Sequence, residues 1–194
     1  MKLRAQLAVA SSQEWLDMVL SNFDSFLQDH ANCERKASSM VLSFVAKYPD
    51  RLEMIPTLIE VSIEELQHFQ QVYQLMQERG VTLATSMEKD HYATRLLKLC
   101  RTGREEHFLD RLVVAGVIET RGAERFRLIA DHLTDRELGQ FYKQFWISEA
   151  KHGHFFFKMA SFYFPKEEIQ KRIDYFVEKE AEVIQSLPIR AVLH

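Results

Sequence analysis

A glutamate followed about thirty residues later by Glu-x-x-His occurs twice in this sequence, and no other feature constrains the fold as strongly. The six residues are Glu34, Glu65 and His68 in the first copy and Glu119, Glu149 and His152 in the second. Positions i and i+3 share one face of an α-helix, so each Glu-x-x-His directs a carboxylate and an imidazole toward one point. Two such helices, with two more that each supply a glutamate, make up the six-ligand set of a di-iron or di-manganese four-helix bundle.

All four glutamates lie within apolar stripes at helical spacing. Leu27 and Val41 stand seven positions before and after Glu34, which places the three on one face. Comparable stripes hold the other ligands and run through residues 58–75, 112–126 and 142–159. A carboxylate buried without a partner is very unfavourable, so four of them on core faces require a cation. Two divalent metal ions would balance their charge if the histidines are neutral.

The donor types favour iron and oxygen chemistry. Carboxylates can bridge two metals and change their binding mode as the metal charge rises, and six protein ligands leave positions open for dioxygen. By analogy with such bundles, we expect Glu65 and Glu149 to bridge the metals and Glu34 and Glu119 to be terminal ligands. All six residues are therefore predicted to be catalytic through the metals that they hold.

The composition agrees with a helical protein. The chain has 194 residues, of which 46% are hydrophobic and only six are Gly and four Pro. Such a chain is long enough for one domain with a full core. We therefore predict a single all-α domain over residues 1–194. It would be a ferritin-like four-helix bundle with a long crossover and additional N- and C-terminal helices.

Capping and breaking residues predict where the helices begin and end. The bundle helices are expected at about residues 23–47, 52–79, 105–132 and 134–163, with a crossover at 81–103 that contains a short helix near 92–100. Ser11-x-x-Glu14 resembles a capping box for a short first helix, and Thr134-x-x-Glu137 resembles one for the fourth bundle helix. Pro165 stands where a proline at the first helical position would start a last helix that ends near Ser186.

Cysteine usage and hydropathy indicate the setting. Cys33 and Cys100 are the only two cysteines, which does not suggest a secreted disulfide scaffold. The first residues contain no long apolar stretch, and no run of 18 or more apolar residues exists anywhere. We therefore expect a cytoplasmic protein with no membrane partner.

Charge is unevenly distributed along the chain. Residues 95–127 hold eight basic and five acidic residues, a local charge of +3 in a chain of net charge −3. A positive crossover on an acidic protein suits a phosphate-bearing partner. An ordinary solvated helix surface explains the same charge pattern equally well.

The residues around the ligands resemble those of the MiaE family of tRNA hydroxylases. The resemblance extends over about residues 5–185 and rests on four stretches: Cys33-Glu34-Arg35-Lys36-Ala37, Glu64-Glu65-Leu66-Gln67-His68-Phe69, residues 118–126 (Ile-Glu-Thr-Arg-Gly-Ala-Glu-Arg-Phe), and Ser148-Glu149-Ala150-Lys151-His152. The ligand pattern itself is shared with all ferritin-like di-iron proteins. The flanking Glu-Arg-Lys, Glu-x-x-x-x-Glu-Arg-Phe and the Arg-Thr-Gly at residues 101–103 are more specific.

The resemblance implies hydroxylation of a 2-methylthio-N6-isopentenyl adenosine beside the anticodon of tRNA. It implies a di-iron centre, dioxygen as co-substrate and two electrons from a reductase or ferredoxin. The partner would be the tRNA anticodon loop, bound by a monomer or small oligomer. Under this hypothesis the candidates for phosphate contacts are Arg95, Lys98, Arg101 and Arg104.

Three alternatives share the same ligands. A di-iron hydroxylase of the ubiquinone-biosynthesis type also has two such repeats, and it would need an apolar surface for membrane docking. A ferritin-like iron oxidase or storage protein would assemble into a large cage. A manganese or mixed-metal oxidase would differ in its metal content alone.

Overall fold

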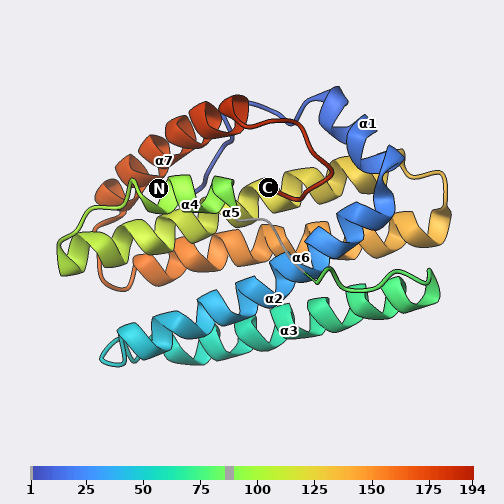
Figure 1. The fold of residues 1–194 in the computed structure, drawn as a ribbon. Helices are drawn as coiled ribbons and strands as arrows, with labels where there is room; N and C mark the ends of the chain where they lie inside the picture. Colours follow the sequence, from blue (N-terminus) through green and yellow to red (C-terminus); the bar gives the residue numbers. More distant parts are fainter. Residues whose placement is uncertain (1, 86–89) are drawn as a thin grey trace. The chain divides into compact units, whose positions relative to one another are not determined.

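The computed structural model describes residues 2–85 and 90–194, and these residues form seven α-helices and no strand (Figure 1). The helices are α1 Gln13–Ser21, α2 Phe23–Lys47, α3 Ile55–Glu78, α4 His91–Leu97, α5 Arg104–His132, α6 Arg136–Ala160 and α7 Lys166–Ser186. Across the described ranges, no helix has both the length and the apolar character that a membrane span requires.

The described residues divide into two compact units. The first unit contains residues 2–16, 90–189 and 194, and therefore α4, α5, α6 and α7. The second unit contains residues 17–85 and 190–193, and therefore α2 and α3. Helix α1 carries the chain from the first unit into the second. The single domain expected from the sequence stays a prediction.

The second unit is an antiparallel helix hairpin, in which α2 and α3 run side by side (Figure 1). Apolar side chains such as Leu27 and Val72 are fully buried along its length. Ser38 and Ser62 exchange hydrogen bonds across the pair, because each hydroxyl donates to the other's carbonyl, at 2.9 and 3.1 Å. This contact fixes the register of the hairpin between the first glutamate and the first Glu-x-x-His. Helix α3 ends at Glu78, and Gly80 follows the cap residue Arg79 with a φ of +69°, which suits the left-handed turn after a helix.

The first unit is built around a second antiparallel hairpin, α5 with α6, and α7 packs against α5 (Figure 1). The two hairpin helices approach closely at Gly153. A Cβ atom there would lie 3.1 Å from the carbonyl oxygen of Gly116 and 3.6 Å from Cβ of Glu119. A Cβ on Gly116 would in turn collide with the ring of Phe157. Glycine at these two positions therefore lets α6 sit directly against the turn of α5 that carries Glu119.

The predicted helix boundaries are confirmed to within a few residues, but two predicted N-caps and one predicted first helical residue are wrong. Ser12, not Ser11, caps α1, since its hydroxyl accepts from the backbone N–H of Trp15 at 3.1 Å. Asp135, not Thr134, caps α6 by accepting from the backbone N–H groups of residues 137 and 138. Pro165 is the N-cap residue of α7 rather than its first helical residue. In each case the prediction is off by one residue.

Candidate metal centre

The α2–α3 hairpin gathers the first three predicted ligands. Glu34 comes from the middle of α2, and Glu65 and His68 lie one turn apart on α3. Their ligand atoms all lie within 4.8 Å of one another. Nδ1 of His68 is 3.5 Å from Oε2 of Glu34 and 3.4 Å from Oε2 of Glu65. Both separations are long for a hydrogen bond, and the three side chains belong to a group of donors that could hold a metal ion. We call these three residues the first half-site.

A residue that the sequence reasoning missed, His30, supports this half-site. It lies one turn before Glu34 on α2, is fully buried, and places Nε2 2.8 Å from Oε1 of that carboxylate. A buried imidazole in contact with a carboxylate occupies the place that partners of metal ligands commonly have. The sequence did contain a signal for His30, because it lies four residues before Glu34 and positions i and i+4 share a helix face.

The α5–α6 hairpin carries the other three predicted ligands, which we call the second half-site. Glu119 lies on α5 beside the close approach at Gly153, and Glu149 and His152 lie one turn apart on α6. Nδ1 of His152 is 3.5 Å from Oε2 of Glu149, which matches the spacing in the first half-site. All three side chains are buried. The histidine and glutamate of the two Glu-x-x-His pairs are therefore similarly spaced in the two hairpins.

The donors in each half-site suit a metal ion. The four glutamates expose at most 7% of their surface, and four buried carboxylates are tolerable only with a balancing positive charge. Two carboxylates and one imidazole per half-site are donors that iron and manganese accept. The apolar stripes predicted around the glutamates are buried as expected, except that Leu75 is partly exposed.

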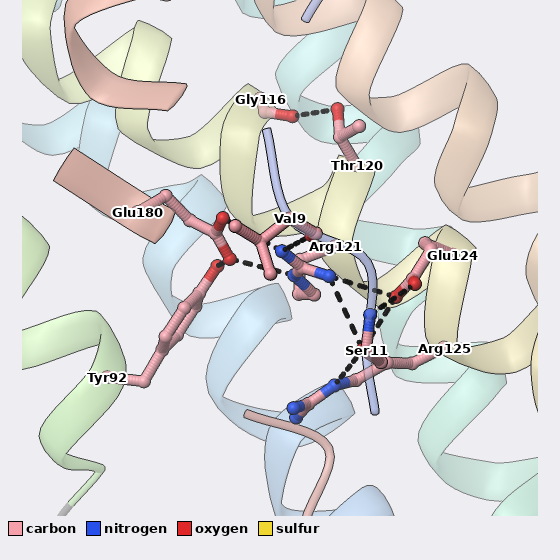
Figure 2. A network of polar contacts seen from close by, with 9 residues as sticks. All are labelled: Val9, Ser11, Tyr92, Gly116, Thr120, Arg121, Glu124, Arg125 and Glu180. Atoms are coloured by element: carbon pink, nitrogen blue, oxygen red, sulfur yellow. Dashed lines mark hydrogen bonds and ion pairs between the residues drawn. The ribbon is translucent and has the colours of Figure 1, made fainter. Parts of the chain in front are cut away.

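A polar network joins α5 to α4, to α7 and to the N-terminal segment of the first unit (Figure 2). Arg121 makes two hydrogen bonds to Glu180 of α7, Nε to Oε1 at 2.7 Å and Nη2 to Oε2 at 2.9 Å. Its remaining N–H groups donate to the carbonyl of Val9, the hydroxyl of Ser11 and the carboxylate of Glu124. Burial alone would lower the pKa of Arg121, but the hydrogen bonds and charge of Glu180 raise it above its usual value. The arginine is therefore a fully satisfied structural cation.

Two further residues complete this network. The hydroxyl of Tyr92 in α4 donates to Oε1 of Glu180 at 3.0 Å. Arg125 donates from Nε to the hydroxyl of Ser11 at 3.0 Å, and its guanidinium stacks 4.3 Å from the ring centre of Trp15. Burial and then the nearby charge of Arg121 lower the pKa of Arg125 to about 10. Ser11 and Trp15 thus attach the N-terminal segment to α5.

Comparison with known proteins decides the family. Residues 2–194 match the family described as tRNA-(MS[2]IO[6]A)-hydroxylase (MiaE). A curated relative from Pseudomonas putida (strain KT2440) is 37% identical over 185 residues, which cover 95% of this chain and 89% of that protein. The chain belongs to the MiaE family. Its members by name are hydroxylases, so the chain is an enzyme.

Two other proteins are similar to this MiaE-family chain. A relative from Salmonella typhimurium (strain LT2) is 34% identical over 134 residues, covering 69% of this chain and 48% of that protein. Both relatives are named tRNA 2-(methylsulfanyl)-N(6)-isopentenyladenosine(37) hydroxylase. A solved structure titled "Protein 43 with aldehyde deformylating oxygenase activity from Synechococcus" has a TM-score of 0.93 and 30% identity, covering 99% of this chain and 96% of that one. This likeness confirms the predicted all-α, ferritin-like fold.

The basic segment at residues 95–127 includes Arg121 and Arg125, and both of its interpretations, a phosphate-binding surface or an ordinary solvated one, place them at the surface. The structure contradicts this, since both are buried in the network described above. Their acceptors on α7 and in the N-terminal segment are distant in sequence, so local charge counting overlooked them.

The four predicted phosphate contacts of this MiaE-family protein lie on or near α4. Arg95, Lys98 and Arg104 are exposed, and Arg95 also donates to the hydroxyl of Ser186 at 2.8 Å. Arg101 is partly exposed and forms a two-bond ion pair with the buried carboxylate of Asp110, at 3.0 and 2.9 Å. Arg101 is therefore committed to a structural partner, whereas the other three present their side chains to solvent.

Proposed function

We propose that this chain is a di-iron, dioxygen-dependent monooxygenase that hydroxylates the isopentenyl group of 2-(methylsulfanyl)-N(6)-isopentenyladenosine in tRNA. The observation that carries the proposal is the repeated half-site of two glutamates and one histidine, in a chain of the MiaE family. The names of the two curated relatives supply the substrate.

The proposal includes one metal centre within one ferritin-like domain. Each half-site alone offers three protein donors, too few to saturate two irons, and the family template combines six. We propose that Glu34, Glu119 and the two Glu-x-x-His pairs act together, with Glu65 and Glu149 as the bridging carboxylates. Two irons held in this way would activate dioxygen and supply the oxidising power for insertion into a C–H bond.

The reaction requires electrons from outside the chain. Insertion of one atom of dioxygen into an allylic C–H bond, with the other atom released as water, consumes two electrons and two protons. We propose a reductase or ferredoxin as the donor and a monomer or small oligomer as the active form. The chain's own residues bind the metals, orient the carboxylates through His30, and keep water from the site through the buried stripes around it.

We further propose that the exposed cations beside α4 contact tRNA phosphates. Arg95, Lys98 and Arg104 all lie on the surface of the first unit. Replacing all three with alanine should weaken tRNA binding and lower its dependence on salt. With fewer phosphates neutralised by the protein, fewer counterions are released from the tRNA on binding. A matched control replaces the exposed Lys143, Lys158 and Lys166 of the same unit. Equal losses in both variants would show a general charge effect and contradict this docking surface.

The activity is tested directly with tRNA that carries the prenylated base. Iron-loaded, reduced protein is exposed to ¹⁸O₂, and the tRNA is digested to nucleosides for mass spectrometry. We expect the isopentenyl nucleoside to gain one ¹⁸O atom, and a Glu65→Ala variant to give none. A base that stays unmodified while a quinone precursor is hydroxylated would overturn the tRNA assignment in favour of the ubiquinone-type alternative.

A further inference from the structure

His194 belongs to the first unit and lies beside the second half-site, although it is 42 residues away from His152 in the sequence. Its ring stacks on the ring of Tyr92 with 5.0 Å between the ring centres and 7° between their planes. Tyr92 is itself immobilised, since it is fully buried and its hydroxyl is bound by Glu180, the partner of Arg121 (Figure 2). The polar network therefore holds a rigid platform for this imidazole.

The free nitrogen of His194 points at a small space on α5. Its Nε2 is inaccessible to solvent, and none of the residues that the structure describes gives it a hydrogen bond. It lies 3.9 Å from the point where a Cβ of Gly122 would stand. Cγ of Glu149 is also 3.9 Å from that point, so the imidazole and the carboxylate side chain border the same space.

The position of Nε2 of His194 suggests that it has a hydrogen-bond partner when the site is complete. A buried polar atom without a partner costs about 1–3 kcal/mol, so such an atom calls for an explanation. Gly122 lies three residues after Glu119, which places the space on the helix face that carries this predicted ligand. An imidazole has at least one N–H to donate in either of its protonation states, so Nε2 can act as a donor here.

We infer that His194 is a positioning residue for Glu149: its Nε2–H donates a hydrogen bond across the space over Gly122, directly or through one buried water, and orients the carboxylate for metal binding. The inference rests on the proposed function, because it takes Glu149 as a metal ligand. Partners of metal ligands commonly act in this way. In this proposal His194 is the partner of Glu149 in the second half-site, as His30 is the partner of Glu34 in the first.

The test measures metal binding rather than turnover. Metal-free protein is titrated with Co²⁺, and both the affinity and the visible spectrum of the bound ion are recorded. His194→Phe keeps an aromatic ring on Tyr92 but removes the N–H. We expect its Co²⁺ affinity to fall by roughly 10–100-fold with an altered spectrum, while the thermal midpoint of the metal-free protein stays close to that of the wild type. His194→Gln, which retains a donor, should recover much of the affinity.

Two variants separate positioning from packing. Gly122→Ala places a methyl group in the space at ordinary contact distance, so the fold tolerates it while the bridge from Nε2 to Glu149 is obstructed. We expect it to weaken Co²⁺ binding like His194→Phe. His154→Phe changes an exposed histidine on the same helix as Glu149 and should bind Co²⁺ like the wild type.

The outcomes distinguish this inference from the proposed function. Wild-type Co²⁺ affinity and spectrum in both His194→Phe and Gly122→Ala would overturn the inference, even if tRNA is hydroxylated. A lower thermal midpoint with unchanged Co²⁺ binding would assign His194 a packing role only, which also overturns it. If the wild type binds Co²⁺ and His194→Phe binds it poorly, the inference holds even when tRNA proves not to be the substrate.

Discussion

At the scale of single residues, the buried ionisable side chains matter most, because they bear on metal binding and on the stability of the fold. His30 faces Glu34, and the guanidinium of Arg121 is enclosed by Glu180 and Glu124. The glutamates of the two half-sites are the proposed metal ligands, whereas the charge of Arg121 is balanced by protein groups. Under the proposed function, the first set of buried charges serves metal binding and the second serves the fold.

The ion pair of Arg121 with Glu180 gives a prediction at this scale. Glu180→Gln leaves a fully buried guanidinium without its main counter-charge, and loss of one partner of such a pair typically costs about 3–5 kcal/mol. We expect urea unfolding to show a destabilisation of that order. Glu182→Gln, which removes the exposed partner of Lys179 on the same helix, is the matched control and should change little. Equal stability of the two variants would contradict the structural role given to the network.

The next scale is the pair of packed helices. In each hairpin, small or hydroxyl-bearing residues fix how one helix is aligned along the other, close to a proposed metal ligand. Ser38 and Ser62 bond across α2 and α3, while Gly116 and Gly153 bring α5 against α6. The positions of the proposed metal ligands therefore depend on residues outside the ligand set. Changes at these positions should affect both stability and metal binding.

Gly153→Ala tests the close approach of α5 and α6. The added methyl would lie 3.1 Å from the backbone oxygen of Gly116, which can move only with its helix, so we expect a loss of about 1–3 kcal/mol in unfolding free energy. Metal affinity should fall as well, since Glu119 moves with the same turn. Gly122→Ala, which meets only atoms at 3.9 Å, should instead gain about 0.5–1 kcal/mol from helix propensity. A stabilised Gly153→Ala variant would contradict the packing described.

The contact between the crossover, α5 and α7 gives a pH prediction. Arg101 and Arg172 both bind the fully buried carboxylate of Asp110. Burial alone would raise the pKa of Asp110, but these hydrogen bonds lower it below its usual value. A carboxyl with a lowered pKa in the folded state stabilises the fold above its unfolded pKa of 3.8, and this stabilisation is lost as the pH falls through the folded value.

Asp110→Asn should therefore be less stable than the wild type at neutral pH, and the difference should shrink as the pH falls below about 4. Unfolding by urea at pH 7, 5 and 3 measures this difference. A gap between the two proteins that stays constant across this range would contradict the assignment of the charge on Asp110 to the ion pairs.

For the whole molecule, the sequence predicted the features that depend on residues within one helix. It did not predict those that depend on contacts between residues distant in the sequence. The helices and the burial of Glu34 or Glu149 follow from spacing along one helix, which a sequence displays directly. The burial of Arg121 and Arg125 depends on Glu180 and on the N-terminal segment, which only the folded chain brings near. His194 was missed for the same reason, because its place on Tyr92 has no local signal.

The proposed function requires that the six predicted ligands together hold one pair of irons. Mössbauer spectroscopy of protein loaded with ⁵⁷Fe and oxidised tests it most directly, with iron content measured on the same sample. We predict two irons per chain and a spectrum without magnetic splitting, as coupled ferric ions give, and loss of the coupled pair in His152→Ala. Magnetically split spectra of isolated ferric ions in the wild type, or a full coupled pair in His152→Ala, would contradict the account.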